Sequence, residues 1–256
     1  MRAIRSAAVL AIGTSLILGG CATERAPLDL TLTPTPTATP STTQTPTPMP
    51  TPTFDTAAYS TDDPTSLWVV VNKRRPLNPT TYAPADLRLA GIRATQDMPM
   101  RADAATAAEA MFAAAQNEAG LTLQLTSAYR SVGSQTRIYN GTVNSIGQAS
   151  ADQVSARPGH SEHQTGLAID IGSLPVSCPF EACFGDTAHG QWLAANAHRF
   201  GFIVRYPQDL TPITGFVFEP WHFRYVGLEL AAELQTTGIR TLEEFFGLPA
   251  APDYAG

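Results

Sequence analysis

A long segment rich in proline and threonine limits what this chain can fold into. Residues 22–64 repeat patterns such as Thr-Pro-Thr-Pro-Thr and contain few large apolar side chains. Proline lacks the backbone N–H that helices need, and so polar a segment cannot bury a core. We expect residues 21–64 to form a disordered, extended spacer of about 3 Å per residue. The folded part of the 256-residue chain must then follow it.

The residues before this spacer have the pattern of a bacterial export signal. Arg2 and Arg5 precede an apolar run over residues 7–18, which is too short to cross a membrane comfortably as a helix. Residues 1–20 are therefore predicted to be a signal peptide. The end of this segment, Leu-Gly-Gly-Cys21, resembles a lipobox, which predicts cleavage before Cys21 and lipid attachment to its thiol. An ordinary signal peptide with a chance cysteine is the alternative.

The lipobox predicts a location outside the cytoplasm. We expect the protein to be anchored to the bacterial cell membrane through the lipid on Cys21 and to face the cell wall. The net charge is −6, and the cluster Lys73-Arg74-Arg75 is predicted to be a surface turn. This charge pattern argues against nucleic-acid binding. We expect a monomer.

The rest of the chain predicts a single compact α+β domain over residues 65–250, with a small antiparallel sheet and flanking helices. Apolar or alternating runs predict extended segments at residues 68–71, 121–126, 167–171, 202–206, 215–218 and 221–225. Helical periodicity predicts helices at residues 100–119, 133–144, 187–199, 228–236 and 241–246. Gly120 is expected to end the first helix.

Two further cysteines lie close together in this domain. Cys178 and Cys183 flank the sequence Pro-Phe-Glu-Ala. In an exported protein this arrangement predicts a disulfide across a short loop. The alternative is a pair of metal ligands, but the spacing is not Cys-x-x-Cys and the chain contains no second pair.

Three side chains form a candidate zinc site. His163 and Asp170 are seven residues apart with Gly166 between them, so a loop and the following strand can direct both to one point. His222 completes a His/Asp/His set, and Zn²⁺ accepts both ligand types while keeping a fourth position for water. Spacing alone leaves a chance association open, and it leaves His160 as an alternative to His163.

Glu219 is placed to act beside such a metal. It lies three residues before His222 in a segment kinked by Pro220. From there its carboxylate can reach the water bound to the metal without being a metal ligand itself. That is the position of a general base which later returns the proton to a leaving amine.

Several separated motifs resemble one family. Residues 161–170, Ser-Glu-His-Gln-Thr-Gly-Leu-Ala-Ile-Asp, resemble the Ser-x-His-x-x-Gly-x-Ala-x-Asp signature of the VanY-type D-alanyl-D-alanine carboxypeptidases. Residues 219–222 resemble that family's Glu-x-x-His motif. Residues 127–131 with Gln135 are similar to its substrate-binding corner. The resemblance extends over about residues 68–228.

The resemblance implies a compact α+β zinc peptidase that acts on peptidoglycan. It implies that His163, Asp170 and His222 bind Zn²⁺ and that Glu219 is the catalytic base. It implies that Arg130 stabilises the oxyanion, for which an always-charged, forked guanidinium is suited. The residues expected to contact substrate are Ser161, Gln135, Trp221 and Tyr129.

These expectations lead to one hypothesis with two rivals. The protein is predicted to remove the terminal D-alanine from peptidoglycan stem peptides. One rival is an L,D-carboxypeptidase with the same metal chemistry that acts on tetrapeptide stems. The other is a non-catalytic lipoprotein that binds the cell wall, and Glu219 argues against it because a binding protein needs no base beside a metal.

Overall fold

The computed structural model describes residues 54–254. The predicted signal peptide, the predicted lipidation site Cys21 and the spacer up to residue 53 lie outside the described residues. Among the helices described, none combines the length and apolar character needed to cross a membrane.

A four-stranded antiparallel sheet is the centre of the domain, as the α+β prediction requires. Its strand order is β3-β4-β6-β5. The strands are β3 (Thr122–Ser127), β4 (Ala168–Leu174), β5 (Phe202–Val204) and β6 (His222–Tyr225). A second, two-stranded sheet pairs β1 (Leu87–Arg88) with β2 (Met100–Arg101). In the larger sheet Asp170 is the register partner of His222, which joins two predicted metal ligands across neighbouring strands.

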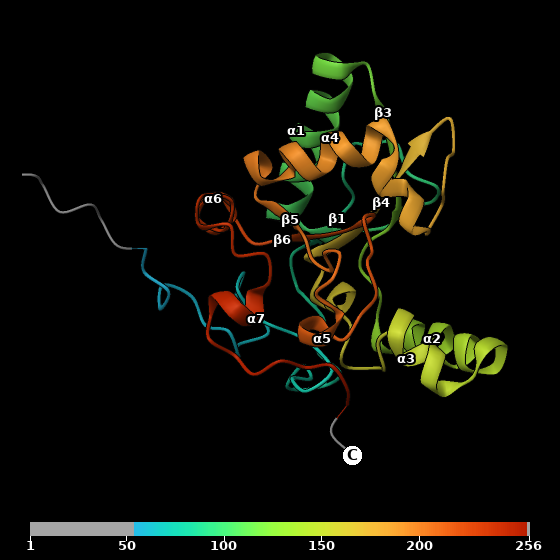
Figure 1. Cartoon of the computed structure of the whole chain (residues 1–256), viewed down its shortest axis with the longest axis vertical. Coiled ribbons are helices and arrows are strands. Elements are labelled where there is room, and N and C mark those ends of the chain that lie inside the picture. Colours follow the sequence, from blue (N-terminus) through green and yellow to red (C-terminus); the bar gives the residue numbers. More distant parts are fainter. Residues whose placement is uncertain (1–53, 255–256) are drawn as a thin grey trace, which may run out of the picture. The chain divides into compact units, whose positions relative to one another are not determined.

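Helices lie on both sides of the sheet, and Figure 1 shows α1 and α4 on one side and α2, α3, α5 and α7 on the other. The α-helices are α1 (Ala102–Ala119), α2 (Val132–Ile146), α3 (Gln148–Val154), α4 (Ala188–Asn196), α5 (Thr211–Thr214), α6 (Leu228–Thr237) and α7 (Leu242–Phe245). The 3-10 helices are η1 (Glu162–Thr165), η2 (Ala182–Asp186) and η3 (Ala197–Phe200). All five predicted helices are present, and Gly120 ends α1 with a φ of 67°.

The main core lies between α1 and the sheet. Apolar residues of α1 repeat on one face, and Met111 and Phe112 are buried there, as helical periodicity requires. They pack in one cluster with Leu125 of β3, Ile169 of β4 and Phe223 of β6. Burying this stripe stabilises the helix against the sheet, because removing apolar surface from water contributes roughly 25 cal/mol per Å².

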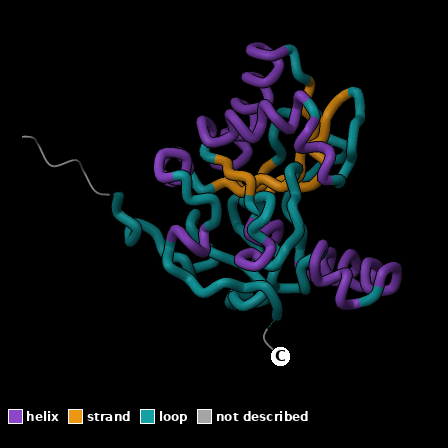
Figure 2. Tube along the Cα trace, viewed as in Figure 1, coloured by secondary structure: helices purple, strands orange, loops and turns teal. Residues whose placement is uncertain are grey.

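The predicted strand at residues 68–71 is wrong, although all four of its side chains are buried. The segment is a loop, on the side of the sheet where loops make up most of the chain (Figure 2). Two of its backbone carbonyls accept hydrogen bonds from arginines: Arg224 donates to Val69 at 2.8 Å, and Arg75 donates to Val70 at 3.1 Å. Because side chains supply these hydrogen bonds, the apolar run needs no neighbouring strand.

The predicted strand at residues 215–218 is also wrong. Gly215 ends α5 with a φ of 84°, and the following backbone turns toward α3, where the N–H of Val217 donates to the carbonyl of Gln153 at 3.2 Å. The partner of β5 is therefore β6. Helix α3 was not predicted, because its sequence carries little apolar periodicity.

Packed structure extends beyond the predicted domain limits of residues 65–250. Phe54 stacks on Trp68, with ring centroids 5.4 Å apart, although residues 54–64 were expected to be spacer. At the other end, the N–H of Arg157 donates to the Tyr254 hydroxyl at 2.8 Å. The Pro/Thr pattern ends at residue 53, and Phe54 has an aromatic ring that the core can bury.

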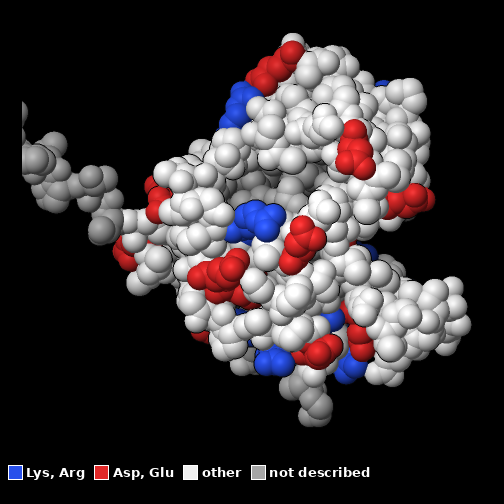
Figure 3. Space-filling model, in the orientation of Figure 1, with Lys and Arg blue, Asp and Glu red and all other residues white. Residues whose placement is uncertain are grey.

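The surface carries charges of both signs. Figure 3 shows basic and acidic side chains interspersed over one face of the molecule. Some of them pair, such as Arg199 with Glu118 and Arg88 with Glu109, each at 2.7 Å. Exposed ion pairs contribute only about 0–1 kcal/mol, so the fold depends mainly on its buried contacts.

Candidate functional site

His163, Asp170 and His222 converge in the structure. One ligand atom from each lies within 4.8 Å of the other two, and all three residues are buried. His163 comes from η1, whereas Asp170 and His222 are neighbours on β4 and β6. Gly166 ends η1 with a φ of 69°, in the left-handed region that favours glycine, and so turns the chain into β4. The predicted trio is thus assembled by one turn and one strand pair.

The hydrogen bonds of the two imidazoles identify which nitrogens face a metal. Nδ1 of His163 lies 2.7 Å from the carbonyl oxygen of Ala128, to which it donates. Its Nε2 lies 3.3 Å from Asp170 Oδ2 and has no hydrogen-bond partner among residues 54–254. His222 directs Nδ1 to Asp170 Oδ1 at 3.2 Å. Two nitrogens and a carboxylate facing one point, with a buried orphaned nitrogen among them, fit a Zn²⁺ ion.

The electrostatics of the trio also suit a cation. Burial, with the neighbouring Arg130 guanidinium, lowers the pKa of His163 to about 4, so this imidazole is neutral as a ligand must be. Burial alone would raise the pKa of Asp170, but His163 and His222 hold it well below its usual range. Burial also opposes protonation of His222, yet hydrogen bonds to Asp170 and Glu162 raise its pKa to about 9. A bound cation would take the place of that proton.

Glu219 lies beside the trio and not within it. Its Oε2 is 3.7 Å from His222 Nδ1, which is the nitrogen that faces the metal position. The backbone holds it there: the N–H of Glu219 donates to Tyr206 at 3.0 Å, and the N–H of His222 donates back to Glu219 at 3.1 Å. Burial raises the pKa of Glu219 to about 8. A neighbouring metal cation would lower that value and favour the carboxylate.

Arg130 reaches the same space from the end of β3. Its backbone N–H donates to the His163 carbonyl at 3.2 Å, which ties this corner to η1. Its Nε is buried and has no hydrogen-bond partner within the described part of the chain. Burial lowers the pKa of Arg130, and Asp170 and Glu219 oppose that effect. An arginine remains charged in such a site, so its unused donor is available to an anionic group.

The cleft around these residues has two halves of unequal size, and we call the smaller one the inner half and the larger one the outer half. The inner half, about 140 Å³, is lined by polar and apolar side chains that include Ser161 and Tyr206. The outer half, about 530 Å³, is lined mainly by apolar side chains: Phe180, Ala182, Val217, Phe218 and Trp221. Arg130, Val154, His163, Glu219 and His222 line both halves. The metal position therefore lies where the two halves meet.

The structure separates the four predicted substrate contacts. Ser161 lines the inner half and Trp221 the outer half. Gln135 is buried and lines neither half; its Nε2 donates to Ala156, a residue of the inner wall, at 2.7 Å. Tyr129 also lines neither half, and its backbone N–H donates to Pro99 at 3.0 Å. Gln135 thus supports the wall of the cleft, and Tyr129 directly precedes Arg130 without lining either half. The contacts of these residues with substrate stay predictions.

His160, the alternative ligand, lies elsewhere. Its Nδ1 is 2.8 Å from the carbonyl oxygen of Asn72, and its ring packs edge-on against Tyr254 with centroids 5.1 Å apart. It is not a member of the metal-ligand group. The trio that uses His163 is the one that the structure assembles.

Sequence reasoning missed Glu162, which lies behind His222. Its Oε2 is 3.6 Å from His222 Nε2, on the side of the imidazole that faces away from the metal position. Its Oε1 accepts hydrogen bonds from Arg205 and Arg224, both at 2.8 Å, and all these side chains are buried. Glu243 completes the network by accepting two hydrogen bonds from Arg205. The available signal was two arginines within apolar strand patterns, since buried arginines need carboxylate partners.

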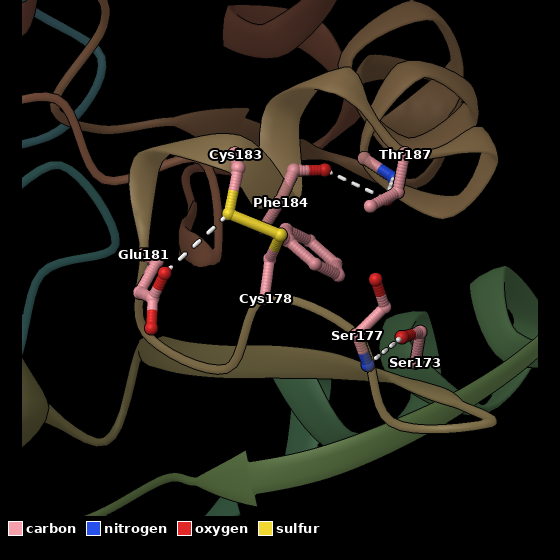
Figure 4. Close-up of a disulfide and its surroundings, with 8 residues drawn as sticks. Ser173, Ser177, Cys178, Glu181, Cys183, Phe184 and Thr187 are labelled. Carbon is pink, nitrogen blue, oxygen red and sulfur yellow. Dashed lines mark hydrogen bonds between the residues drawn. A yellow bond between two sulfur atoms is a disulfide. The ribbon is translucent and has the colours of Figure 1, made fainter.

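Cys178 and Cys183 form the predicted disulfide, shown in Figure 4. Their Cα atoms are 5.7 Å apart. The loop that they close carries Phe180, and with Ala182 it forms part of the outer half of the cleft.

Comparison with known proteins identifies similar sequences. A model of the VanY family, described as D-alanyl-D-alanine carboxypeptidase, matches residues 97–228. The chain is 40% identical over 189 residues to the putative carboxypeptidase YodJ of Bacillus subtilis, covering 72% of this chain and 68% of YodJ. It is also 40% identical over 128 residues to the bifunctional D-Ala-D-Ala dipeptidase and carboxypeptidase VanXYC of Enterococcus gallinarum, covering 48% of this chain and 65% of that protein.

Solved structures are similar as well. The LdcB LD-carboxypeptidase is 39% identical with a TM-score of 0.66, covering 72% of this chain and 87% of LdcB. The D,D-pentapeptidase VanY of a VanB-type resistance cassette, solved with Zn(II), is 31% identical with a TM-score of 0.56, covering 69% of this chain and 97% of that one. The L,D-carboxypeptidase DacB of Streptococcus pneumonia is 34% identical with a TM-score of 0.57, covering 73% of this chain and 89% of DacB. These similar structures thus include both specificities.

Proposed function

Because the chain belongs to the VanY family of D-alanyl-D-alanine carboxypeptidases, we propose that it hydrolyses the bond before the terminal D-alanine of peptidoglycan stem pentapeptides. It is a zinc-dependent carboxypeptidase that acts on peptidoglycan peptides, with His163, Asp170 and His222 as its metal-binding residues. One observation carries the proposal: Glu219 and Arg130 face the metal trio at the junction of a small and a large half-cleft.

The two volumes support one orientation of the substrate. A carboxypeptidase must hold a single residue on the carboxyl side of the scissile bond and a longer peptide on the amino side. The inner half of about 140 Å³ suits the small terminal D-alanine, with Ser161 on its wall. The outer half of about 530 Å³ takes the preceding residues. The scissile bond then lies between Arg130 and Glu219.

The proposed mechanism assigns a separate task to each side chain. When zinc is bound by the trio, it supplies Lewis-acid polarisation and makes water acidic enough to lose a proton near neutral pH. Glu219 accepts that proton and later donates it to the leaving amine of D-alanine. Arg130 donates its unpaired N–H to the carbonyl oxygen as negative charge develops there. The cleft walls hold the peptide in place.

Product analysis tests the reaction. Purified protein is incubated separately with a stem pentapeptide and with a stem tetrapeptide, and each reaction is followed by mass spectrometry. We expect the pentapeptide to lose one D-alanine and the tetrapeptide to remain intact. Loss of D-alanine from the tetrapeptide alone would establish the L,D rival, which the similarity to LdcB and DacB supports.

The wall-binding rival requires a different outcome. A non-catalytic binding protein would retain peptidoglycan without releasing any amino acid. We expect D-alanine release that stops when a chelator removes the zinc and resumes when zinc is restored. Binding to wall material without any release would contradict the catalytic proposal.

We also propose that the enzyme is exported and anchored through a lipid on Cys21. The support is the charged and apolar pattern of residues 1–20 followed by the lipobox-like Leu-Gly-Gly-Cys21. Fractionation of cells tests it: the protein should be in the membrane fraction, and Cys21→Ala should release it. An unchanged membrane location of that variant would favour another form of attachment. That the protein is a monomer stays a prediction.

A further inference from the structure

The loop closed by the Cys178–Cys183 disulfide is fixed at both ends. On its amino side, the N–H of Ser177 donates to Oγ of Ser173 in β4 at 3.1 Å. On its carboxyl side, Phe184 is 1% exposed and packs into the main core. The carbonyl of Phe184 accepts a hydrogen bond from the hydroxyl of Thr187 at 2.7 Å, and Figure 4 shows these anchors around the disulfide. The loop is thus held between the sheet and α4.

Within this loop the backbone has an uncommon conformation. Cys178 has a φ of 47° and Phe180 a φ of 56°. Residues other than glycine rarely adopt a positive φ of this size, and they keep it where the surrounding contacts enforce it. Here the disulfide joins the two ends of the loop, and the N–H of Glu181 donates to the Cys178 carbonyl at 3.3 Å. The covalent link therefore helps to determine where the ring of Phe180 lies.

Phe180 presents an aromatic surface to the outer half of the cleft. The residue is 54% exposed, although it lines the same space as His163 and Glu219. Its ring meets Trp221 edge-on, with centroids 6.0 Å apart and an interplanar angle of 80°. Trp221 directly precedes His222, and its carbonyl accepts a hydrogen bond from Ile171 of β4 at 2.9 Å. The backbone of Trp221 is thus fixed to the sheet, and the loop that carries Phe180 is closed by the disulfide.

The remaining walls of the outer half define what this aromatic pair can bind. Val154, Val217 and Phe218 are apolar, and the charged groups of this half are those of the metal site: Arg130, Asp170 and Glu219. A peptide that enters here meets hydrocarbon on its sides and charge only at the reacting bond. Such a site favours a side chain with a long aliphatic stem, whose polar end can extend into water.

We propose that Phe180, held by the Cys178–Cys183 disulfide, determines specificity for the residue that precedes the two terminal alanines of the stem peptide. Phe180 and Trp221 pack against the methylene chain of a diamino acid at that position. This inference rests on the proposed function, because it uses the same orientation of the peptide in the cleft. It assigns a role in substrate selection to a loop outside the metal trio.

Two synthetic peptides test the proposal with the full-length protein. They are diacetyl-L-Lys-D-Ala-D-Ala and acetyl-L-Ala-D-Ala-D-Ala. These peptides differ only in the side chain of the first residue, which is a long acetylated lysine chain in one and a methyl group in the other. We expect wild type to prefer the lysine peptide. Phe180→Ala should lower kcat/KM for that peptide about tenfold, mainly through KM, since that is the scale of one lost aromatic contact. The alanine peptide should change by less than about twofold, because it makes no such contact.

Matched variants separate this role from general damage. Leu228→Ala removes another exposed apolar side chain, 61% exposed on α6, and should alter neither peptide. Phe180→Leu keeps apolar bulk and should fall between wild type and Phe180→Ala. The double variant Cys178→Ser/Cys183→Ser should reduce the preference for the lysine peptide while zinc content stays at that of wild type.

Each outcome decides one claim. An unchanged ratio of the two kcat/KM values in Phe180→Ala overturns the role of Phe180. An unchanged ratio in the double cysteine variant overturns the role of the disulfide. If wild type releases D-alanine from neither peptide, the D,D-specificity of the proposed function fails. Calorimetric binding of the same two peptides to the zinc-loaded protein then tests the preference, and equal affinities would overturn it.

Discussion

The two halves of the cleft are constructed differently. The inner half and the metal trio rest on a buried network in which Glu162, Arg205 and Arg224 are all fully enclosed. The outer half rests on a disulfide-closed loop and presents Phe180, which is 54% exposed. Reacting groups need fixed positions, because small displacements reduce rate strongly. A surface that selects a peptide side chain tolerates more freedom.

This comparison predicts a gradient of mutational effects. Substitutions at the metal trio should abolish turnover, and substitutions in the buried support should weaken metal binding. Substitutions in the outer half should change KM for particular peptides. Four variants test the gradient from its largest effect to its smallest.

His163→Ala removes one of three metal ligands, and we expect zinc and D-alanine release to fall to background. Elemental analysis of the purified variant and an amino-acid release assay measure both effects. His160→Ala is the matched control, because His160 bonds to the Asn72 carbonyl away from the trio and should leave zinc unchanged. Full zinc content in His163→Ala would mean that another side chain completes the site.

Glu219→Gln should retain zinc and lose turnover. Glutamine has the same shape but cannot accept a proton at this position, and general bases contribute about 10²–10⁴-fold to rate. Steady-state kinetics beside zinc analysis would show kcat reduced by that factor with metal content unchanged. Near-normal kcat would exclude Glu219 as the base.

Glu162→Gln should weaken zinc affinity or activity by about 10–100-fold, the scale seen when a partner behind a metal ligand is lost. Glu243→Gln is the control, because Glu243 bonds Arg205 without facing His222. Both variants should lower the unfolding temperature, but only Glu162→Gln should change zinc affinity in a competition with a chelating dye. Equal zinc affinities would reduce Glu162 to a structural role.

Trp221→Phe should have the smallest effect. The variant keeps an aromatic ring beside Phe180 and loses part of the contact area, so we expect KM for a lysine-containing peptide to rise about twofold to threefold. The value of kcat should not change, and initial-rate kinetics with the two synthetic peptides would show this. A large fall in kcat would place Trp221 with the reacting groups and remove the distinction between the two halves.

Much of the secondary structure and the fold class could be predicted from local sequence. The long helix α1 with its Gly120 end, strands β3 and β4 and the α+β class follow from periodicity, which depends on neighbouring residues only. The metal residues are of types that bind zinc, but their spacing alone left a chance association open, and the family motif removed both that alternative and the choice between His160 and His163. These features need no knowledge of distant contacts.

The tertiary structure decided what depends on residues far apart in the chain. Residues 68–71 are apolar as a strand would be, but they form a loop, and Arg224, more than 150 positions away, donates to the carbonyl of Val69. Glu162 directly precedes the metal ligand His163 in sequence. Its buried carboxylate is nevertheless paired with Arg205 and Arg224, which the sheet brings to it. The sequence by itself determined which three residues form the metal site. Their support and the division of the cleft arise from long-range packing, which no local pattern encodes.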